Sequence, residues 1–240
     1  MFGHWELRDG IGVAVTDRHG GGSASPYDGL NLADHVGDDP AAVAANRESV
    51  RAALSGGVAL VAMRQVHGTD VAVIDGPTDV PPEADALVTA VPGLALMVLV
   101  ADCAPVLLWD RRAGVIAAVH AGRRGLAAGV LPATLKTMAA LGARADRIYA
   151  ALGPSICPEH YEVPADMRAD VETAAPGAAA TTAAGAPALD IRAGLLAQLH
   201  AAGVRKGMVM PHCTAETPDY YSYRRDGTTG RFAGLVWREP

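Results

Sequence analysis

Uninterrupted apolar runs, rather than alternating ones, dominate the centre of the chain. Residues 94–101 are hydrophobic throughout, and residues 114–119 form a second apolar run. Continuous runs of this length are typical of strands that are buried on both faces. We therefore interpret Met97–Gly125 as two buried strands, with a kink or bulge at Pro105, because proline cannot donate a hydrogen bond to a sheet.

Shorter elements are predicted on both sides of this stretch. Apolar segments bounded by turn residues predict strands within residues 5–16, 58–66, 71–74, 86–89, 147–152, 208–210 and 232–237. Helical spacing of apolar residues predicts helices over residues 41–54, 126–141, 165–172 and 191–202. Pro132 places the true start of the second helix near Leu131.

The chain shows no internal repeat and no clear domain boundary, so residues 1–240 are predicted to form a single domain. Residues 174–188 are rich in alanine, glycine, proline and threonine. The same kind of element pattern resumes after them. This low-complexity stretch is therefore predicted to be a variable surface loop rather than a linker between domains.

Composition narrows the classes of partner. The chain is 50% hydrophobic and carries a net charge of −6, which argues against a nucleic-acid groove or an anionic membrane surface as its main partner. The longest apolar run is too short to span a membrane. Three widely spaced cysteines imply no disulfide framework and indicate a reducing compartment, so a cytoplasmic location is expected.

Both central strands end in residues that carry chemistry. Asp102-Cys103 follows the first run, and His120 follows the second, immediately before a glycine turn. Open α/β sheets present ligands at strand ends, so Cys103 and His120 can reach one pocket from neighbouring strands. The alternatives are a small buried hydrophobe for Cys103 and a solvated or capped side chain for His120. His67, in a turn between two predicted strands, has the same solvated alternative.

Seven separated blocks, in order, resemble the YfiH-like laccase-domain family, which is described both as polyphenol oxidase and as purine nucleoside phosphorylase. One block is the loop at residues 28–47. The others are RQVHGTDV at 64–71, DALVT at 85–89, ADCAPVLL at 101–108, HAGRRGL at 120–126, LGPSI at 152–156 and SYRRDGTTGR at 222–231. The resemblance covers nearly the whole chain. One departure is Arg123, which stands where the family usually has tryptophan.

The resemblance implies an α/β fold of the α+β type, a layered sandwich of mixed β-sheets enclosed by helices. It also implies a metal site made of His67, Cys103 and His120. Two imidazoles and a thiolate suit zinc and leave a fourth position for water or substrate. The same ligands accept copper, which binds more tightly in the general order of affinities. Zinc is therefore the expected cofactor, with copper as the alternative.

The leading functional hypothesis is a purine nucleoside phosphorylase acting on adenosine, inosine, guanosine or methylthioadenosine, with phosphate as the second substrate. Adenosine deamination is associated with the same family, and Asp102 is our candidate to move protons there. Its alternative role is to orient a ligand histidine. The candidate phosphate and substrate ligands follow the family blocks and are Arg64, Gln65, Arg124, Arg224 and Arg225. For any single arginine, ordinary surface charge is the competing interpretation.

Three other classes of function remain open from the sequence. A Cys–His hydrolase that edits a peptidoglycan precursor would use Cys103 as nucleophile and His120 as base, and it would not need His67. A copper-dependent polyphenol oxidase would need more ligands than one cysteine and two histidines supply. A non-catalytic metal-binding or partner-binding protein would make no use of an open coordination position.

The other two cysteines match no ligand block. Cys157 and Cys213 are therefore predicted to be dispensable for binding the metal of the family site. Cys213 follows His212 directly at the end of a predicted strand, so a second site containing these two residues is the alternative.

Overall fold

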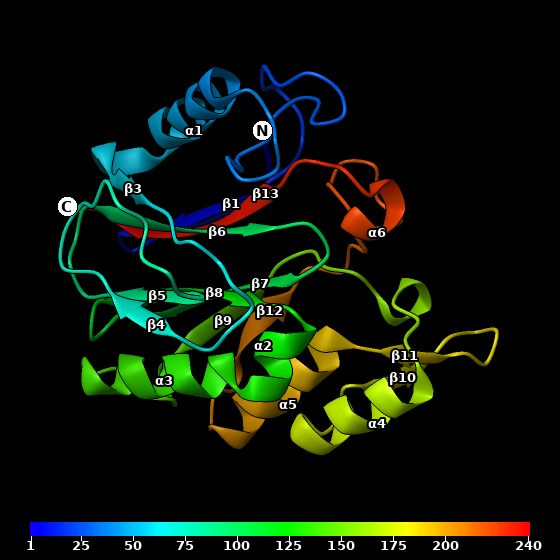
Figure 1. Cartoon of the computed structure of the whole chain (residues 1–240). Helices are drawn as coiled ribbons and strands as arrows, with labels where there is room; N and C mark the ends of the chain where they lie inside the picture. The colour runs from blue at the N-terminus through cyan, green and yellow to red at the C-terminus, as the bar shows by residue number, and fades with distance from the viewer.

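Two mixed β-sheets lie face to face, and helices cover both outer surfaces in the computed structural model, which describes residues 1–240 (Figure 1). One sheet has five strands in the order β1-β2-β13-β6-β3, and the other has six in the order β12-β9-β7-β8-β5-β4. Helix α1 lies over the five-stranded sheet, and α2, α3 and α5 lie under the six-stranded one (Figure 1). The predicted sandwich of mixed sheets enclosed by helices in a single domain is confirmed.

The five-stranded sheet combines the two ends of the chain with one central strand. Its members are β1 (Phe2–Arg8), β2 (Ile11–Thr16), β13 (Phe232–Arg238), β6 (Leu94–Val100) and β3 (Ala59–Val61). The six-stranded sheet contains β12 (Lys206–Val209), β9 (Tyr149–Leu152), β7 (Ala104–Asp110), β8 (Val115–Ala121), β5 (Ala86–Thr89) and β4 (Val71–Val73). A separate hairpin pairs β10 (Ala179–Thr181) with β11 (Pro187–Leu189).

The helices are α1 (Pro40–Ala53), α2 (Arg123–Ala128), α3 (Val130–Ala140), α4 (Ala165–Ala174), α5 (Ile191–Ala201) and α6 (Tyr223–Asp226). Two short 3₁₀ helices, η1 (Ser55–Gly57) and η2 (Pro158–His160), complete the set. Helix α1 begins as its sequence predicts, because the Asp39 side chain accepts a hydrogen bond from the Ala41 N–H and Pro40 occupies the first turn. No helix has the length and apolar character needed to cross a membrane.

Three hydrophobic clusters hold the layers together. The middle cluster lies between the two sheets and includes Leu96 of β6 and Leu107 of β7. The largest lies between the six-stranded sheet and the helices beneath it, and the smallest lies between the five-stranded sheet and α1. Because the inner strands face protein on both sides, their sequences are continuous apolar runs rather than alternating patterns.

The prediction of two strands within Met97–Gly125 was wrong, because the stretch contains three. β6 ends at Val100, a tight turn carries Asp102 and Cys103, and β7 begins at Ala104. Asp102 has φ +92°, so the chain reverses there instead of continuing through a kink. Pro105 is tolerated as the second residue of β7, where its missing N–H costs little.

Two other predicted elements differ from the observed ones. The predicted helix over 126–141 is two helices, α2 and α3, separated at Gly129, whose φ of +89° favours glycine. The stretch 174–188 was predicted to be a loop but contains the β10–β11 hairpin. Its alanines are not all at the surface, since Ala175, Ala178 and Ala188 are buried against the helices.

Candidate active site and metal centre

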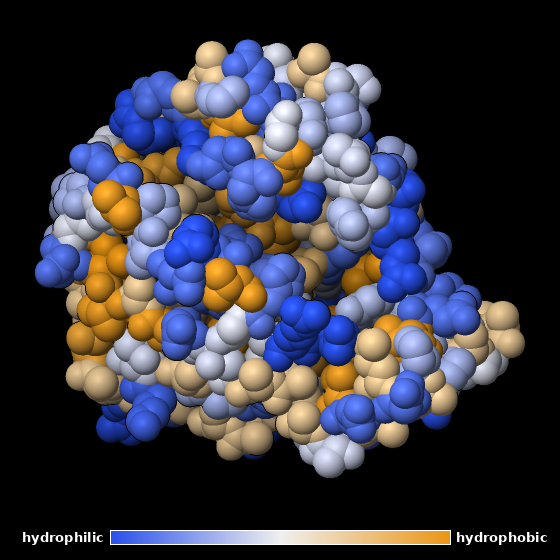
Figure 2. Space-filling model, in the orientation of Figure 1, coloured by the Kyte–Doolittle hydropathy of each residue, from blue (hydrophilic) through white to orange (hydrophobic).

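A cavity of about 680 Å³ opens at the edge of the sandwich where β6 ends and β7 and β8 pair. Its lining is half apolar and half polar, and the side chains with polar or reactive groups include His67, Asp102, Cys103, His120, Arg123, Tyr161, Arg224 and Arg231. The space-filling view shows hydrophilic and hydrophobic residues interspersed over the face drawn in Figure 1 (Figure 2). The size suits a ligand as large as a nucleoside.

Three side chains with metal-binding atoms meet in this cavity. The donor atoms of His67, Cys103 and His120 all lie within 4.8 Å of one another. Cys103 lies just before β7 and His120 near the end of β8, and the antiparallel pairing of these strands places both at one edge. His67 comes from the turn before β4, and its ring meets that of His120 edge to face at 4.7 Å between centroids.

Asp85 holds two of these three residues in place, and the sequence analysis gave it no role. Its carboxylate is fully buried. One oxygen accepts hydrogen bonds from the His67 N–H at 2.9 Å and lies 2.7 Å from Nδ1 of His120. The other accepts from the N–H of Gly68 at 2.6 Å and of Val66 at 3.2 Å. One carboxylate therefore fixes both the turn and the ring.

The hydrogen bonds to Asp85 determine which ring nitrogen of His120 is available and hold the backbone of His67. Because Nδ1 of His120 faces the Asp85 carboxylate, its Nε2 is left for a metal or for Cys103. His67 has φ +61°, an uncommon conformation for a residue with a side chain, and the three N–H bonds to Asp85 stabilise it. The signal in the sequence was an aspartate at the start of a buried strand, within the block DALVT.

Electrostatics favour charged forms of the central pair. Burial raises the pKa of the Cys103 thiol, but the charge of His120 and hydrogen bonds from both histidines outweigh it and lower the pKa to about 6. Burial lowers the pKa of His120, but Cys103 and Asp85 outweigh this effect and raise it to about 9. Burial also raises the pKa of Asp85, and hydrogen bonds from His120 and Gly68 reverse this, leaving it below its usual range.

The three donors fit a metal ion. Sγ of Cys103 and Nε2 of His67 lie 3.8 Å apart, and a thiolate and an imidazole on one tetrahedral zinc are separated by about 3.6 Å. The thiol loses its proton readily, which metal binding requires. Asp85 supplies the carboxylate–histidine contact that commonly supports zinc ligands. A tetrahedral ion held by these three donors would have one further ligand position.

Asp102 has a different environment from that of Asp85. Its Oδ1 accepts a hydrogen bond from the Thr214 hydroxyl at 2.6 Å, and its Oδ2 accepts from the Arg224 N–H at 2.7 Å. No hydrogen bond joins its carboxylate to a ligand histidine, so Asp85 and not Asp102 orients His120. Asp102 joins the turn before Cys103 to two distant loops of the cavity wall.

The five candidate substrate ligands lie in different surroundings. Arg224 and Gln65 line the cavity, and the Gln65 amide is held in place by Leu99, donating to its carbonyl at 2.7 Å and accepting from its N–H at 2.8 Å. The remaining three arginines do not line the cavity: Arg64 pairs with Glu83, Arg225 pairs with Asp226, and Arg124 is exposed.

Two other arginines face the cavity, and the sequence analysis did not select them as phosphate ligands. Arg123, at the family's tryptophan position, lies close enough to the Tyr161 hydroxyl to oppose the rise that burial causes in its pKa. Arg231 is half-buried and donates to the carbonyls of Thr229 and Gly230. With Arg224, three guanidinium groups surround a cavity whose lining holds one carboxylate, that of Asp102.

The absence of a side chain at Gly122 leaves room for the side chains of Cys103 and His67. A Cβ atom added there would lie 2.8 Å from Sγ of Cys103 and 3.1 Å from Cδ2 of His67. Its φ of −83° is ordinary, so the requirement for glycine is the close approach of the two ligands and not the backbone conformation.

We expect Gly122→Ala to keep the fold and to weaken metal binding by at least tenfold, because the methyl group displaces Cys103 and His67. Zinc affinity measured by competition with a chromogenic chelator checks this. Gly76→Ala is the control, since a Cβ there meets nothing within 4 Å and its backbone is outside the left-handed region. Unchanged zinc affinity in Gly122→Ala would show that the metal lies elsewhere.

The two-sheet fold and the Cys/His cluster define a class of α/β protein whose sheet edge carries three side chains that could hold a metal ion. The family model described as multi-copper polyphenol oxidoreductase laccase matches residues 12–239. The chain therefore belongs to this family, and the resemblance noted from the sequence blocks is confirmed.

Several relatives are close over their whole length. A purine nucleoside phosphorylase of Streptomyces coelicolor is 54% identical over 240 residues, 99% of each chain. The purine nucleoside phosphorylase YfiH of Shigella flexneri is 40% identical over 97% of this chain and 96% of its own. The crystal structure of YlmD from Geobacillus stearothermophilus matches with a TM-score of 0.88 at 32% identity, covering 97% of this chain and 93% of that one.

Proposed function

We propose that this chain is a purine nucleoside phosphorylase that acts at the cavity above His67, Cys103 and His120. The observation that carries the proposal is the combination of a metal-ligand cluster with three cavity arginines in a protein of net charge −6. The names of the full-length relatives point to the same activity. The substrates we propose are inosine, adenosine, guanosine and methylthioadenosine, with inorganic phosphate.

The reaction requires phosphate to attack the anomeric carbon of the ribose while the purine leaves. The transition state resembles a sugar cation, so the main tasks are to position two reactants and to place charge. Arg123, Arg224 and Arg231 hold the phosphate in this proposal, because guanidinium binds phosphate oxygens bidentately. The apolar part of the lining, which includes Leu99, Ile156 and Ile191, receives the flat purine.

His67, Cys103 and His120 would hold zinc, which supplies a Lewis acid at the floor of the cavity. Asp85 keeps His120 in the tautomer that presents Nε2 and keeps the His67 turn closed. Asp102 fixes the wall that carries Arg224 through its bond to the Arg224 N–H. Each of these residues acts by holding a ligand or substrate group in position.

The assay that tests the proposal measures the products formed from inosine and from adenosine, each with and without phosphate. Purified protein with inosine should release hypoxanthine and ribose 1-phosphate only when phosphate is present. With adenosine, inosine formation in the absence of phosphate would demonstrate the deamination that we infer as a second reaction at the site. Asp102 is the one carboxylate that lines the cavity, and both of its oxygens already accept hydrogen bonds, so we expect deamination to be the slower reaction.

One observation favours a second candidate, the Cys–His hydrolase. In the metal-free protein the lowered pKa of Cys103 and the raised pKa of His120 describe a thiolate–imidazolium pair, which is the activated form of a cysteine nucleophile. Such an enzyme would cleave a muropeptide precursor and would be inhibited by zinc. Cleavage of that substrate, with no action on nucleosides, would replace the phosphorylase proposal.

The oxidase hypothesis finds less support in the cavity. Its one cluster has three donor atoms, and a copper oxidase needs a larger ligand set to bind and reduce oxygen. Copper can still occupy the site, since thiolate and imidazole both suit it. The zinc and copper forms should be compared in the same phosphorolysis assay.

Arg123 is one of the three cavity arginines, and its loss should weaken phosphate binding. We expect Arg123→Ala to raise the KM for phosphate by about 30-fold or more, which corresponds to the lower end of the 2–5 kcal/mol typical of a lost buried charge contact. The KM for inosine should change much less. Steady-state kinetics with each substrate varied in turn makes this measurement.

Arg124→Ala is the matched control, because Arg124 is the next residue in the chain and is exposed outside the cavity. The sequence analysis included Arg124 among the candidate phosphate ligands. A larger effect on phosphate KM in Arg124→Ala than in Arg123→Ala would support that choice and contradict the one made here.

A further inference from the structure

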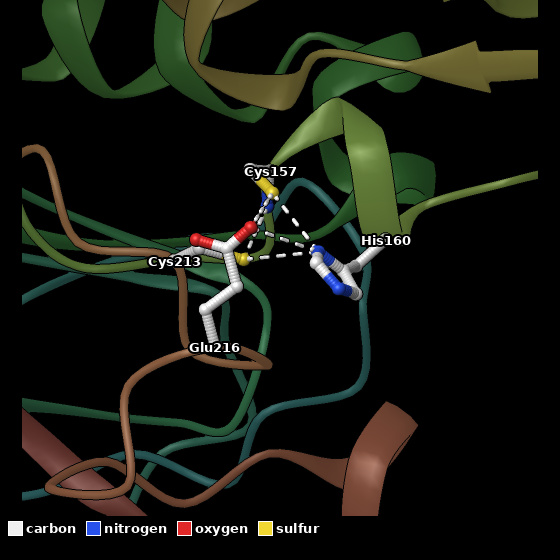
Figure 3. Close-up of side chains that lie close together, drawn as sticks. All are labelled: Cys157, His160, Cys213 and Glu216. Atoms are coloured by element: carbon white, nitrogen blue, oxygen red, sulfur yellow. Dashed lines mark hydrogen bonds and ion pairs between the residues drawn. The ribbon is translucent and has the colours of Figure 1, made fainter. Parts of the chain in front are cut away.

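A second cluster of metal-binding side chains lies outside the cavity. Cys157, His160, Cys213 and Glu216 bring one donor atom each to within 4.8 Å of one another (Figure 3). They come from two loops, and each loop supplies a pair at a spacing of three residues. Cys157 and His160 follow β9, and His160 is the last residue of η2. Cys213 and Glu216 follow β12.

We propose that these four residues form a second, structural zinc site. Four of the separations between donor atoms are close to the edge lengths of a zinc tetrahedron. Nδ1 of His160 lies 3.3 Å from Sγ of Cys157, 3.9 Å from Sγ of Cys213 and 3.3 Å from Oε1 of Glu216. Sγ of Cys157 lies 3.7 Å from the same Glu216 oxygen. Ligands that share one tetrahedral zinc are separated by about 3.3–3.8 Å.

The ligand types fit zinc better than they fit a hard cation. Two thiolates, one imidazole and one carboxylate form a closed set of four, and zinc is bound by these same groups in proteins. Calcium and magnesium take oxygen ligands in larger numbers. Since all four positions would be filled by protein, the site has no open position for substrate, and its role is structural.

The same atoms do not form a catalytic triad. In a Cys–His–Glu triad the cysteine and the carboxylate contact different nitrogens of the histidine, so that a proton moves across the ring. Here both Sγ of Cys157 and Oε1 of Glu216 approach Nδ1 of His160 (Figure 3). The donor atoms of all four residues lie within 4.8 Å of one another, as ligand atoms that surround one shared ion do.

The backbone of both loops is ordered around the cluster. The N–H of Cys157 points at Sγ of Cys213 at 3.2 Å, a contact that commonly accompanies a metal-bound thiolate. The N–H groups of Glu216 and Thr217 both donate to the Cys213 carbonyl. These hydrogen bonds hold the two thiols side by side, with Cys213 buried and Cys157 half-buried.

The ion would tie together two loops that both contact Asp102. The N–H of Ile156 donates to the Asp102 carbonyl at 3.0 Å, and the Thr214 hydroxyl donates to its side chain at 2.6 Å. Asp102 precedes Cys103, a ligand of the first site. The second ion would therefore stiffen the cavity wall without taking part in its chemistry, and the proposal stands independently of the reaction proposed above.

The test counts metal ions in variants that separate the two sites. Protein purified under reducing conditions, saturated with zinc and desalted should hold two equivalents. Cys103→Ser should hold one equivalent, in the second site, and Cys213→Ser should hold one, in the first. His160→Ala removes a half-exposed ligand with little loss of packing, so it gives the same answer if Cys213→Ser fails to fold.

His212→Ala is the matched control. The sequence analysis paired His212 with Cys213, but its ring lies near Tyr220, at 5.9 Å between centroids, and it offers no atom to the cluster. This variant should keep two equivalents. Loss of one equivalent in His212→Ala, with retention in His160→Ala, would overturn the ligand assignment.

Cobalt substitution tests the thiolate ligands directly. In Cys103→Ser protein, bound Co²⁺ should show sulfur-to-cobalt charge-transfer absorption from Cys157 and Cys213, and a further Cys213→Ser change should reduce it by about half or more. Binding of no metal by reduced Cys103→Ser protein would overturn the proposal. A Cys157–Cys213 disulfide that survives treatment with excess reductant and zinc would also overturn the proposal.

Discussion

Cys103→Ala protein should fold normally, lose the zinc ion of the cavity and show no measurable phosphorolysis. The thiol is half-buried at the margin of the cluster between the two sheets, and the change to alanine removes one sulfur atom only, so it costs little folding energy. It removes the one sulfur among the three donors of the first site. Two imidazoles alone are an incomplete set for zinc, which takes three protein ligands in catalytic sites.

The measurement combines metal analysis with the phosphate-dependent release of hypoxanthine from inosine. His67→Ala and His120→Ala should lose the same single equivalent. His212→Ala is the control, since His212 is exposed and belongs to neither metal-binding cluster, so metal content and phosphorolysis should both stay intact. A Cys103→Ala protein that keeps its full metal content would contradict the assignment of all three ligands, because no other thiol lines the cavity.

Local patterns were enough to predict most elements of the fold. The buried runs of β6 and β8, the cap at Asp39 and the helical spacing of α5 each follow from neighbouring residues alone. Errors arose where a turn interrupts an apolar pattern. At Asp102 and at Gly129 the backbone takes positive φ, and apolar residues on both sides conceal the break.

Only those site residues that stand out from their immediate neighbours in the sequence could be predicted. Cys103 and His120 stand out because an apolar strand has no packing use for them. Asp85 does not stand out, because its importance depends on the turn that packs against it from 17–19 residues earlier in the chain. Arg123 and Arg124 are adjacent in sequence, and only the geometry of α2 decides which of them faces the cavity.

Replacing the buried Asp85 should be the most damaging single change at the site. We expect Asp85→Asn to lower zinc affinity by about 10–100-fold and the free energy of unfolding by about 3–5 kcal/mol. The carboxylate accepts from three backbone N–H groups and pairs with His120. An amide has one acceptor oxygen and one NH₂ donor, so a donor would face a donor on one side of the turn.

Urea unfolding of the metal-free protein and zinc competition separate these two effects. Asp70→Asn is the matched control, because Asp70 lies at the end of the same turn and its side chain is exposed. Asp70→Asn should leave both the zinc affinity and the free energy of unfolding almost unchanged. If Asp85→Asn lowered stability but left zinc affinity unchanged, Asp85 would support the turn alone, and orientation of the His120 ligand would have to come from packing. The 2.7 Å contact between the Asp85 carboxylate and Nδ1 of His120 is the reason we expect both quantities to fall together.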